Sequence, residues 1–193
     1  MAMRLVGPWT AVRIRKGHRV LEMTDHSFTL IIKGDVENQL DELFAAGLDD
    51  ATFGAVGGVQ YGDVDREAPT LADAIGSAII DVESVPGLRV LRVEPDDLVT
   101  AAEIAQRLGR SRESVRLLIA GKRGRSQFPA PVSHLRSRNR LWRWADVAAW
   151  AGAEPAQVTR AQLIAALNAA LELRNGSPRL PERARSLVDS LRR

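Results

Sequence analysis

The chain has 193 residues, of which 45% are hydrophobic, and a formal net charge of +3. That length can supply one large hydrophobic core or two smaller ones, while the lack of cysteine excludes disulfide bonds and cysteine-based metal sites. No apolar run is long enough to cross a membrane and the first residues lack the apolar core of a signal peptide, so we expect a cytoplasmic, nucleoid-associated protein with no membrane partner.

The charge is distributed unevenly along the chain. Counting Lys and Arg against Asp and Glu gives +4 for residues 1–24, −12 for residues 25–97, +8 for residues 98–150 and +3 for residues 151–193. A positive block of this density is typical of a segment that binds polyphosphate. The acidic block is expected to point away from nucleic acid, which makes it a candidate for contacts with a protein or a ligand.

We divide the chain into four parts: a basic N-terminal extension (1–24), an acidic interaction domain (25–97), a DNA-binding domain (98–152) and C-terminal amphipathic helices (153–193). The extension is interpreted either as a disordered DNA-binding arm or as a segment without function. We favour the second interpretation, because Met23 immediately precedes the first ordered pattern and could be the true start.

The acidic domain is predicted to have the element order β-α-β-β-α-β. Strands are expected at residues 28–32, 52–56, 59–64 and 88–93, and helices at 36–46 and 71–82. The first helix is expected to be amphipathic, with Leu40, Leu43 and Phe44 on one face and Gly47 as its stop. Thr70 is expected to cap the second helix, and Gly57-Gly58 to form a two-residue hairpin turn. This order defines a split βαβ, or ferredoxin-like, domain in the α+β class, with one sheet face open to a second copy, a partner or a ligand.

The sequence contains no pattern that indicates catalysis. We interpret the carboxylates of Asp49, Asp50, Asp63 and Asp65 as solvated surface groups, although Asp63 and Asp65 share a strand face. The three histidines are isolated, and no nucleophile or phosphate-loop motif occurs. We therefore expect a protein that is not an enzyme and uses neither a metal nor a cofactor. The acidic joint 94–97 is too short for a free linker, so the two domains are expected to pack together.

Residues 99–121 predict two short helices joined by a tight turn at Gly109. Thr100 and Glu103 have the spacing of a capping box, and Ser111 is placed to cap the second helix. Arg112 and Arg116 are four residues apart and so share the exposed face of that helix. Arginines in this position can bind guanine edges or grip phosphates, which favours a helix-turn-helix that reads the DNA major groove.

The next segment predicts a wing, meaning a hairpin that follows the two helices. Strand-like runs at 132–135 and 141–144 flank a polar tip, and residues 146–150 form a short closing helix. Arginines at the tip are expected to lie near phosphates or the minor groove. Trp144 and Trp150 are expected to pack in the core, with stacking on bases as the alternative.

Residues 98–151 resemble the winged-helix domains of the MerR superfamily, most nearly those of the AlpA or excisionase type. The resemblance rests on TAAEIAQRLGRSRESVRLLIAG, on FPAPV after a short basic loop, and on LWRWADVAAWAG. It implies that the helix 111–120 enters the major groove and that the wing touches the backbone. The chain departs from full MerR sensors, which follow this domain with a long dimerising helix and an effector domain, because here the additional large domain comes first.

The candidate DNA-contacting residues come from the second helix, the basic loop after it and the wing. They are Arg110, Ser111, Arg112, Glu113, Arg116, Lys122, Arg123, Arg125, Arg136, Arg138, Asn139 and Arg140.

Two amphipathic helices are predicted after residue 152. The first spans 159–175 with an apolar stripe of Leu163, Ile164, Leu167 and Leu171, and the second carries Leu180, Ala184, Leu187, Val188 and Leu191. These stripes are expected either to pack on the winged domain of the same chain or to form a homodimer.

Taken together, these patterns predict a sequence-specific transcription regulator, expected to be a repressor that binds double-stranded DNA as a homodimer. One alternative is an antitoxin-like inhibitory module whose acidic domain binds a protein partner and which autoregulates its operon. Another is an excisionase-like architectural factor that bends DNA.

Overall fold

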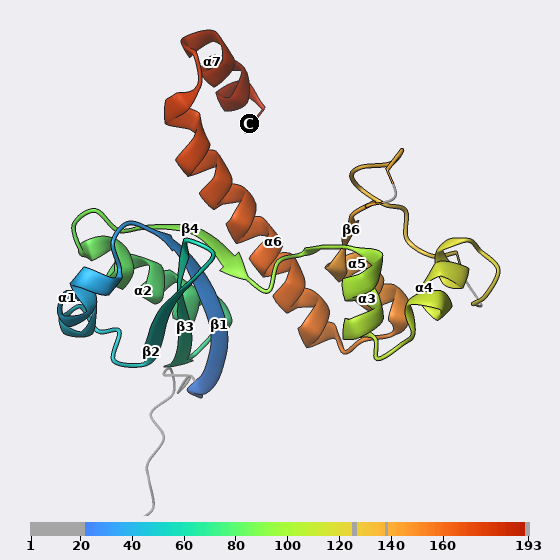
Figure 1. The fold of residues 1–193 in the computed structure, drawn as a ribbon, viewed down its shortest axis with the longest axis horizontal. Helices are drawn as coiled ribbons and strands as arrows, with labels where there is room; N and C mark the ends of the chain where they lie inside the picture. Colours follow the sequence, from blue (N-terminus) through green and yellow to red (C-terminus); the bar gives the residue numbers. More distant parts are fainter. Residues whose placement is uncertain (1–21, 125–126, 138, 192–193) are drawn as a thin grey trace, which may run out of the picture.

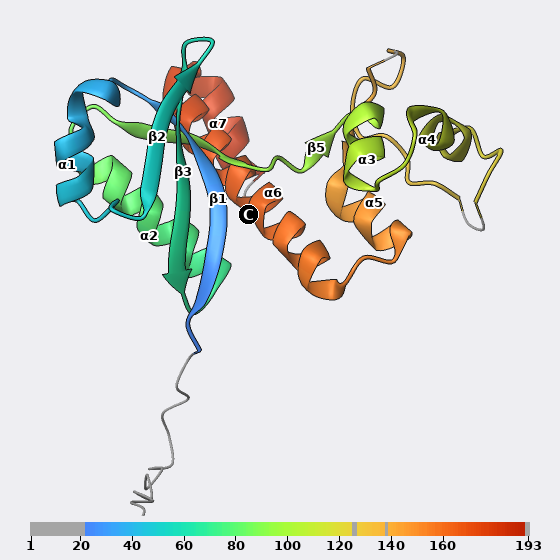
Figure 2. The same ribbon diagram turned by 60° about the horizontal axis from the view of Figure 1, so that its bottom comes forward.

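The computed structural model describes residues 22–124, 127–137 and 139–191 of this chain (Figure 1). In this part of the chain it contains seven α-helices, a four-stranded antiparallel sheet and a two-stranded ribbon, and is therefore a mixed α+β protein. We call residues 24–94 the sheet unit and residues 98–151 the helical unit. A long helix that follows them, α6, runs between the two units (Figures 1 and 2).

The sheet unit has the predicted element order β-α-β-β-α-β. Its strands are β1 (Thr24–Lys33), β2 (Ala51–Val56), β3 (Val59–Ala68) and β4 (Arg89–Glu94), and its helices are α1 (Leu40–Ala45), preceded by the short 3-10 helix η1 (Glu37–Gln39), and α2 (Leu71–Ser84). The strands lie in the order β2-β3-β1-β4, and each neighbouring pair is antiparallel. β1 and β3 extend several residues beyond the predicted ranges.

Local sequence explains most of these elements. Alternate residues of β1 are buried, with Phe28, Leu30 and Ile32 facing a core shared with α2. Gly57 and Gly58 both have positive φ angles, of 59° and 81°, as the predicted two-residue hairpin turn requires. The hydroxyl of Thr70 caps α2 as predicted, accepting a hydrogen bond from the Asp73 amide at 3.1 Å.

The first helix differs from the prediction. Instead of a helix over 36–46, the chain forms η1 and the six-residue α1. Leu43 is fully buried, but Leu40 and Phe44 are 48% and 67% exposed, so the three residues do not form one buried apolar face. Because so short a helix meets the core with a single turn, only one of its side chains can point inward. Gly47, with a φ of 101°, follows the helix as predicted.

The helical unit contains α3 (Ala101–Arg107), α4 (Arg112–Ile119) and α5 (Trp144–Ala151), with a short antiparallel ribbon of β5 (Leu98–Val99) and β6 (Trp142–Arg143). Its core is separate from that of the sheet unit. Trp142 lies inside this core, with Trp144 and Trp150 packed against it. The predicted core packing of Trp144 and Trp150 is therefore confirmed.

α6 (Pro155–Gly176) is longer than the predicted helix and packs against both β4 and α5. Ile164 and Leu171, from its predicted apolar stripe, are buried in the core of the sheet unit. The Asn168 side chain is hydrogen-bonded to the backbone of Val93 on β4, one of the two edge strands of the sheet. The helix was expected to pack on the winged domain or on a second copy. It does pack against α5 of the helical unit, but its apolar stripe covers the sheet unit at the edge strand β4.

The last helix contrasts with α6. A short 3-10 helix, η2 (Ser177–Arg179), leads into α7 (Glu182–Ser190), whose predicted apolar stripe finds little cover. Leu187 is 61% exposed and Leu191 is 79% exposed. The apolar face of α7 is therefore open to solvent in the single chain.

Candidate nucleic-acid interface

The two helices α3 and α4 are capped as the sequence predicts. The Thr100 hydroxyl accepts from the Glu103 amide at 3.3 Å, and the Glu103 carboxylate accepts from the Thr100 amide at 2.6 Å, which completes the capping box. Gly109 has a φ of 60° in the turn that follows. Ser111 then caps α4, accepting from the Ser114 amide at 3.1 Å. These caps fix where α4 begins, and so fix which of its residues face outward.

The inner face of the helix pair is held by apolar packing. Ile104 and Val115, one from each helix, are fully buried together with Trp142. The Trp142 indole donates to the Pro129 carbonyl oxygen at 3.1 Å, which ties the segment after α4 to the same core. The ring centres of Phe128 and Trp150 lie 4.8 Å apart in an edge-to-face contact. The outer face of α4 is thus presented on a packed support.

That outer face carries the charged residues expected to contact DNA. Arg112, Glu113 and Arg116 are exposed, as are Arg110 and Ser111 just before the helix. Glu113 accepts two hydrogen bonds from Arg116, at 2.6 and 2.7 Å, in a forked ion pair. The hydrogen bond to Arg116 is the main reason that the pKa of Glu113 lies below its ordinary value, and the same bond raises the pKa of Arg116.

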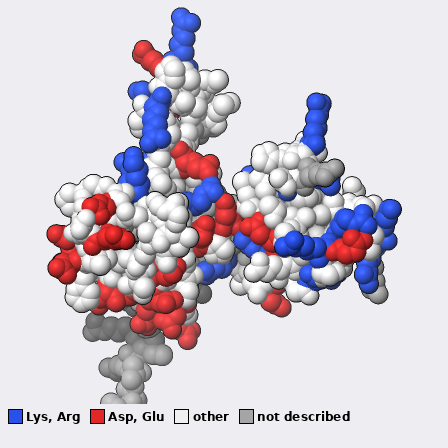
Figure 3. All heavy atoms as spheres, in the orientation of Figure 1, with Lys and Arg blue, Asp and Glu red and all other residues white. Residues whose placement is uncertain are grey.

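The basic loop extends this surface beyond α4. Lys122 and Arg123 are exposed directly after the helix, while Arg125 lies outside the described residues. Figure 3 shows basic side chains gathered at the end of the helical unit that is far from the sheet, and acidic side chains spread over the sheet unit. The charge asymmetry of the sequence therefore becomes a separation in space, which would attract a polyanion to one end of the molecule.

The predicted wing is only partly a hairpin of two strands. One bridge joins Ser133 to Leu141, and the Leu141 carbonyl oxygen accepts from the Val132 amide at 2.8 Å. Residues 142–143, predicted to continue this hairpin, pair with β5 instead. The physical reason is burial, because Trp142 is drawn into the core below the helix pair and takes its strand with it.

The residues at the tip of the wing differ in how free they are. Arg136 and Asn139 are exposed, and Arg138 lies outside the described residues. Arg140 is half-buried, with its guanidinium 5.6 Å from the centre of the Trp142 ring. Arg136 is therefore freer to reach a phosphate than Arg140, which must first leave the indole.

Two features in or next to the helical unit were missed from the sequence. The Glu113–Arg116 pair follows from their i, i+3 spacing, which is a signal that could have been used. The second feature is Asp97, which the sequence placed in the acidic joint 94–97. Asp97 is only 3% exposed and holds neighbouring elements in place. Its carboxylate accepts from Arg143 and from the Ala145 amide at 3.1 Å each, so it orders the start of α5. No local sequence pattern indicates that role.

Comparison of the chain with protein-family models, with curated proteins and with solved structures gave no match. Of the described helices, none combines the length and apolarity needed to cross a lipid bilayer. Within the same part of the chain, His, Asp and Glu side chains nowhere gather in a group of three that could hold a metal ion.

Proposed function

We propose that this protein is a sequence-specific double-stranded DNA-binding regulator of transcription, and specifically a repressor. The observation that carries the proposal is α4, a capped helix that projects Arg112 and Arg116 from a packed core at the basic end of the molecule. α4 would enter the major groove, where arginine forms paired hydrogen bonds with guanine. Lys122, Arg123 and Arg136 would bind phosphates.

The same proposal assigns a fold family to each of the two units. Residues 98–151 would be a winged helix-turn-helix of the MerR superfamily, nearest to the AlpA or excisionase type, and the sheet unit would be a ferredoxin-like interaction domain. The capped helix pair and the bridged hairpin after it support the first assignment. The antiparallel strand order β2-β3-β1-β4 supports the second.

The proposal is tested by selecting bound duplexes from a random DNA pool at physiological salt with the full chain. An enriched motif is the expected result. Replacing Arg116 by Ala should then cost about 1–3 kcal/mol of binding free energy and relax the preference at one base position. The exposed Arg179, on the short η2 segment, provides the matched control as Arg179→Ala. No enrichment, or an equal loss on every sequence for Arg116→Ala, would contradict base reading by α4.

A homodimer is part of this proposal, and α7 is the element that supports it. The stripe of α6 is already covered by β4, whereas Leu187 and Leu191 on α7 are exposed. A second copy would cover them and place two α4 helices on two half-sites. Sedimentation of the wild type and of Leu187→Glu tests this. We expect the wild type to sediment as a dimer and Leu187→Glu as a monomer. A wild type that binds DNA as a monomer would contradict the proposed homodimer.

A second candidate function is an antitoxin-like module that binds a protein through the sheet unit. The open face of the sheet favours it, because Val56 and Val59 are exposed beside Tyr61 and the carboxylates of Asp63 and Glu94 line the same hollow. An apolar patch with an acidic border suits a basic partner. Co-purification of one basic protein from native cells, lost on Val56→Asp, would support this function, and a clean preparation would count against it.

A further inference from the structure

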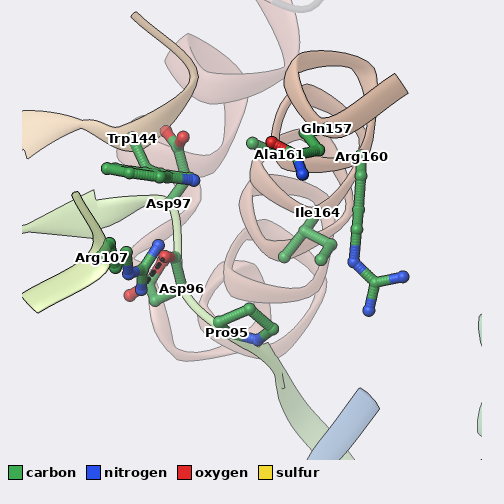
Figure 4. Close-up of a pocket in the computed structure, with 9 residues that line it drawn as sticks. All are labelled: Pro95, Asp96, Asp97, Arg107, Trp144, Gln157, Arg160, Ala161 and Ile164. Carbon is green, nitrogen blue, oxygen red and sulfur yellow. Dashed lines mark hydrogen bonds between the residues drawn. The ribbon is translucent and has the colours of Figure 1, made fainter. Parts of the chain in front are cut away.

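A cavity of about 420 Å³ lies between the helical unit and α6 (Figure 4). Arg107 from α3 and Trp144 from α5 form one wall. Ala161, Ile164 and Arg160 from α6 form the opposite wall, and Pro95 lies at one end. This volume is within the range of small-molecule binding sites in proteins. Because its walls come from three helices and the joint, the cavity exists only when the helical unit and α6 are docked together.

Both arginines that line the cavity lack a carboxylate partner. One Nη2 hydrogen of Arg107 goes to the backbone carbonyl oxygen of Asp96 at 3.1 Å, and Arg160 donates to the backbone carbonyl oxygen of Ser27. Within the described residues, neither guanidinium is within ion-pair distance of an acidic side chain. Each keeps further N–H donors and a full positive charge, since carbonyl oxygens neutralise neither.

Two carboxylates, those of Asp96 and Asp97, also line the cavity, and both are already paired with other groups. Asp96 pairs with Arg92, and Asp97 accepts from Arg143 and from the amide that follows Trp144. Neither carboxylate is therefore available to balance Arg107 or Arg160. The arginines are therefore the charges of the lining that lack an ionic partner, and an anion bound between the walls would be only partly screened by water.

Apart from these charged groups and the exposed Gln157, the lining is apolar. The indole of Trp144 is half-buried, and the Arg107 guanidinium lies 5.1 Å from the centre of its ring. Ile164 and Ala161 face it across the space in Figure 4. A flat apolar body fits between an indole and an aliphatic side chain, while an anionic group attached to that body can reach an arginine.

We propose that this cavity binds a small planar organic anion, whose carboxylate or phosphate pairs with Arg107 and Arg160 while its apolar body packs against Trp144 and Ile164. The proposal does not involve DNA, so it stands or fails separately from the proposed function. Carboxylate and phosphate ligands share this chemistry, and the test distinguishes them.

The test uses the full chain with benzoate and phenyl phosphate as probes, benzamide as the neutral analogue of benzoate, and sodium chloride to match ionic strength. Binding is followed by NMR at the Trp144 indole N–H signal, which is assigned by its loss in Trp144→Phe. Trp142 and Trp150 serve as internal references, because neither lines the cavity. We expect saturable shifts at Trp144 with one or both anions, and at least tenfold weaker binding of benzamide. The tighter of the two anions identifies the natural head group.

Substitutions then separate charge from shape. Arg107→Met and Arg160→Met should each weaken anion binding at least tenfold, while Arg179→Met should leave it unchanged. Ala161→Leu keeps both charges and adds side-chain volume opposite Trp144, so it should weaken binding at least tenfold even if an arginine variant is unstable. Three results would overturn the proposal: no Trp144 shift with either anion up to about 10 mM, where fragment-sized ligands occupy a real site; equal binding of benzamide; or binding insensitive to all three cavity variants.

Discussion

Asn168 on α6 is hydrogen-bonded through both ends of its side-chain amide to Val93 on β4. Its Oδ1 accepts from the Val93 amide at 2.8 Å, and its Nδ2 donates to the Val93 carbonyl oxygen at 2.9 Å. The side chain thus pairs with the outer strand as another strand would. It satisfies two backbone groups that a helix could not otherwise reach, and it sets the position of α6 along the sheet.

Replacing Asn168 by Leu should lower the free energy of unfolding by about 1–3 kcal/mol, because two buried backbone groups of Val93 then lose their partners. Urea titration of the full chain measures this change. Gln162, exposed on the same helix, provides the control as Gln162→Leu, which should change stability little. An Asn168→Leu protein as stable as the wild type would show that the pairing contributes nothing to folding.

Arg66 on β3 is the buried cation of the sheet unit, and all its N–H groups have partners. It donates to both carboxylate oxygens of Asp50, to Asp81, to Ser77 and to the Gly47 carbonyl oxygen, at 2.6–3.0 Å. The bonds to Asp50 are the main reason that the pKa of Arg66 is raised, while burial opposes this effect. The guanidinium therefore ties β3 to α2 and to the loop before β2. The interpretation of Asp50 as a solvated surface carboxylate is wrong, because both its oxygens accept from this buried arginine.

Replacing Arg66 by Met should destabilise the protein by about 3–5 kcal/mol, since Asp50 and Asp81 would keep their charges without a counter-ion. Arg66→Lys should recover part of this loss, because an ammonium supplies charge but not the forked geometry. Thermal unfolding monitored by circular dichroism measures the stabilities, which should decrease in the order wild type, Arg66→Lys, Arg66→Met. The exposed Arg183 on α7 gives the control substitution. A Lys variant no better than Met would contradict the role of charge.

The Glu113 carboxyl should titrate below its ordinary pKa, because the ionised form accepts two hydrogen bonds from Arg116. A lowered folded-state pKa means that the pair contributes stability above the ordinary carboxyl pKa, and that this contribution is lost as the pH falls through the lowered value. Carbon-13 NMR of the side-chain carboxyl measures the titration. Arg116→Met should return the pKa to its ordinary range, whereas Arg112→Met should not.

Lys122 and Arg123 should contribute to DNA affinity without contributing to sequence preference. Replacing either by Ala is expected to weaken binding on selected and random duplexes alike, and to reduce the slope of log K against log salt by about 0.9. Fluorescence anisotropy over a series of salt concentrations measures both quantities. A loss confined to the selected motif would instead assign these side chains to base contacts.

Much of the fold could be predicted because it depends on local signals. Thr100, Ser111 and Thr70 cap their helices where the sequence indicates, and Gly57-Gly58 turns the hairpin. Exposure along α1 could not be predicted, since the helical period does not reveal that only one turn would meet the core. The surface that covers α6 could not be predicted either. An apolar stripe indicates that a helix face is buried, but it does not indicate which element buries it.

The candidate site shows the same division. The exposure of Arg112 and Arg116 follows from the period of α4 between its caps, which local sequence sets. The engagement of Arg140 with Trp142 and of Asp97 with α5 depends on residues brought together by the fold. The cavity beside Arg107 lies still further from any motif, because its walls are far apart in the sequence.

Because α6 contributes Ile164 and Leu171 to one core and also packs against α5, the two units cannot be separated by a single cut. A fragment ending at residue 97 would lack α6 and leave β4 exposed to solvent. A fragment starting at residue 98 would carry α6 with its apolar stripe exposed. We therefore expect the full chain to melt in one calorimetric transition. Recombination between genes would have to exchange the two units together. A new unit could replace an old one only if it came with a helix that fits it in the place of α6.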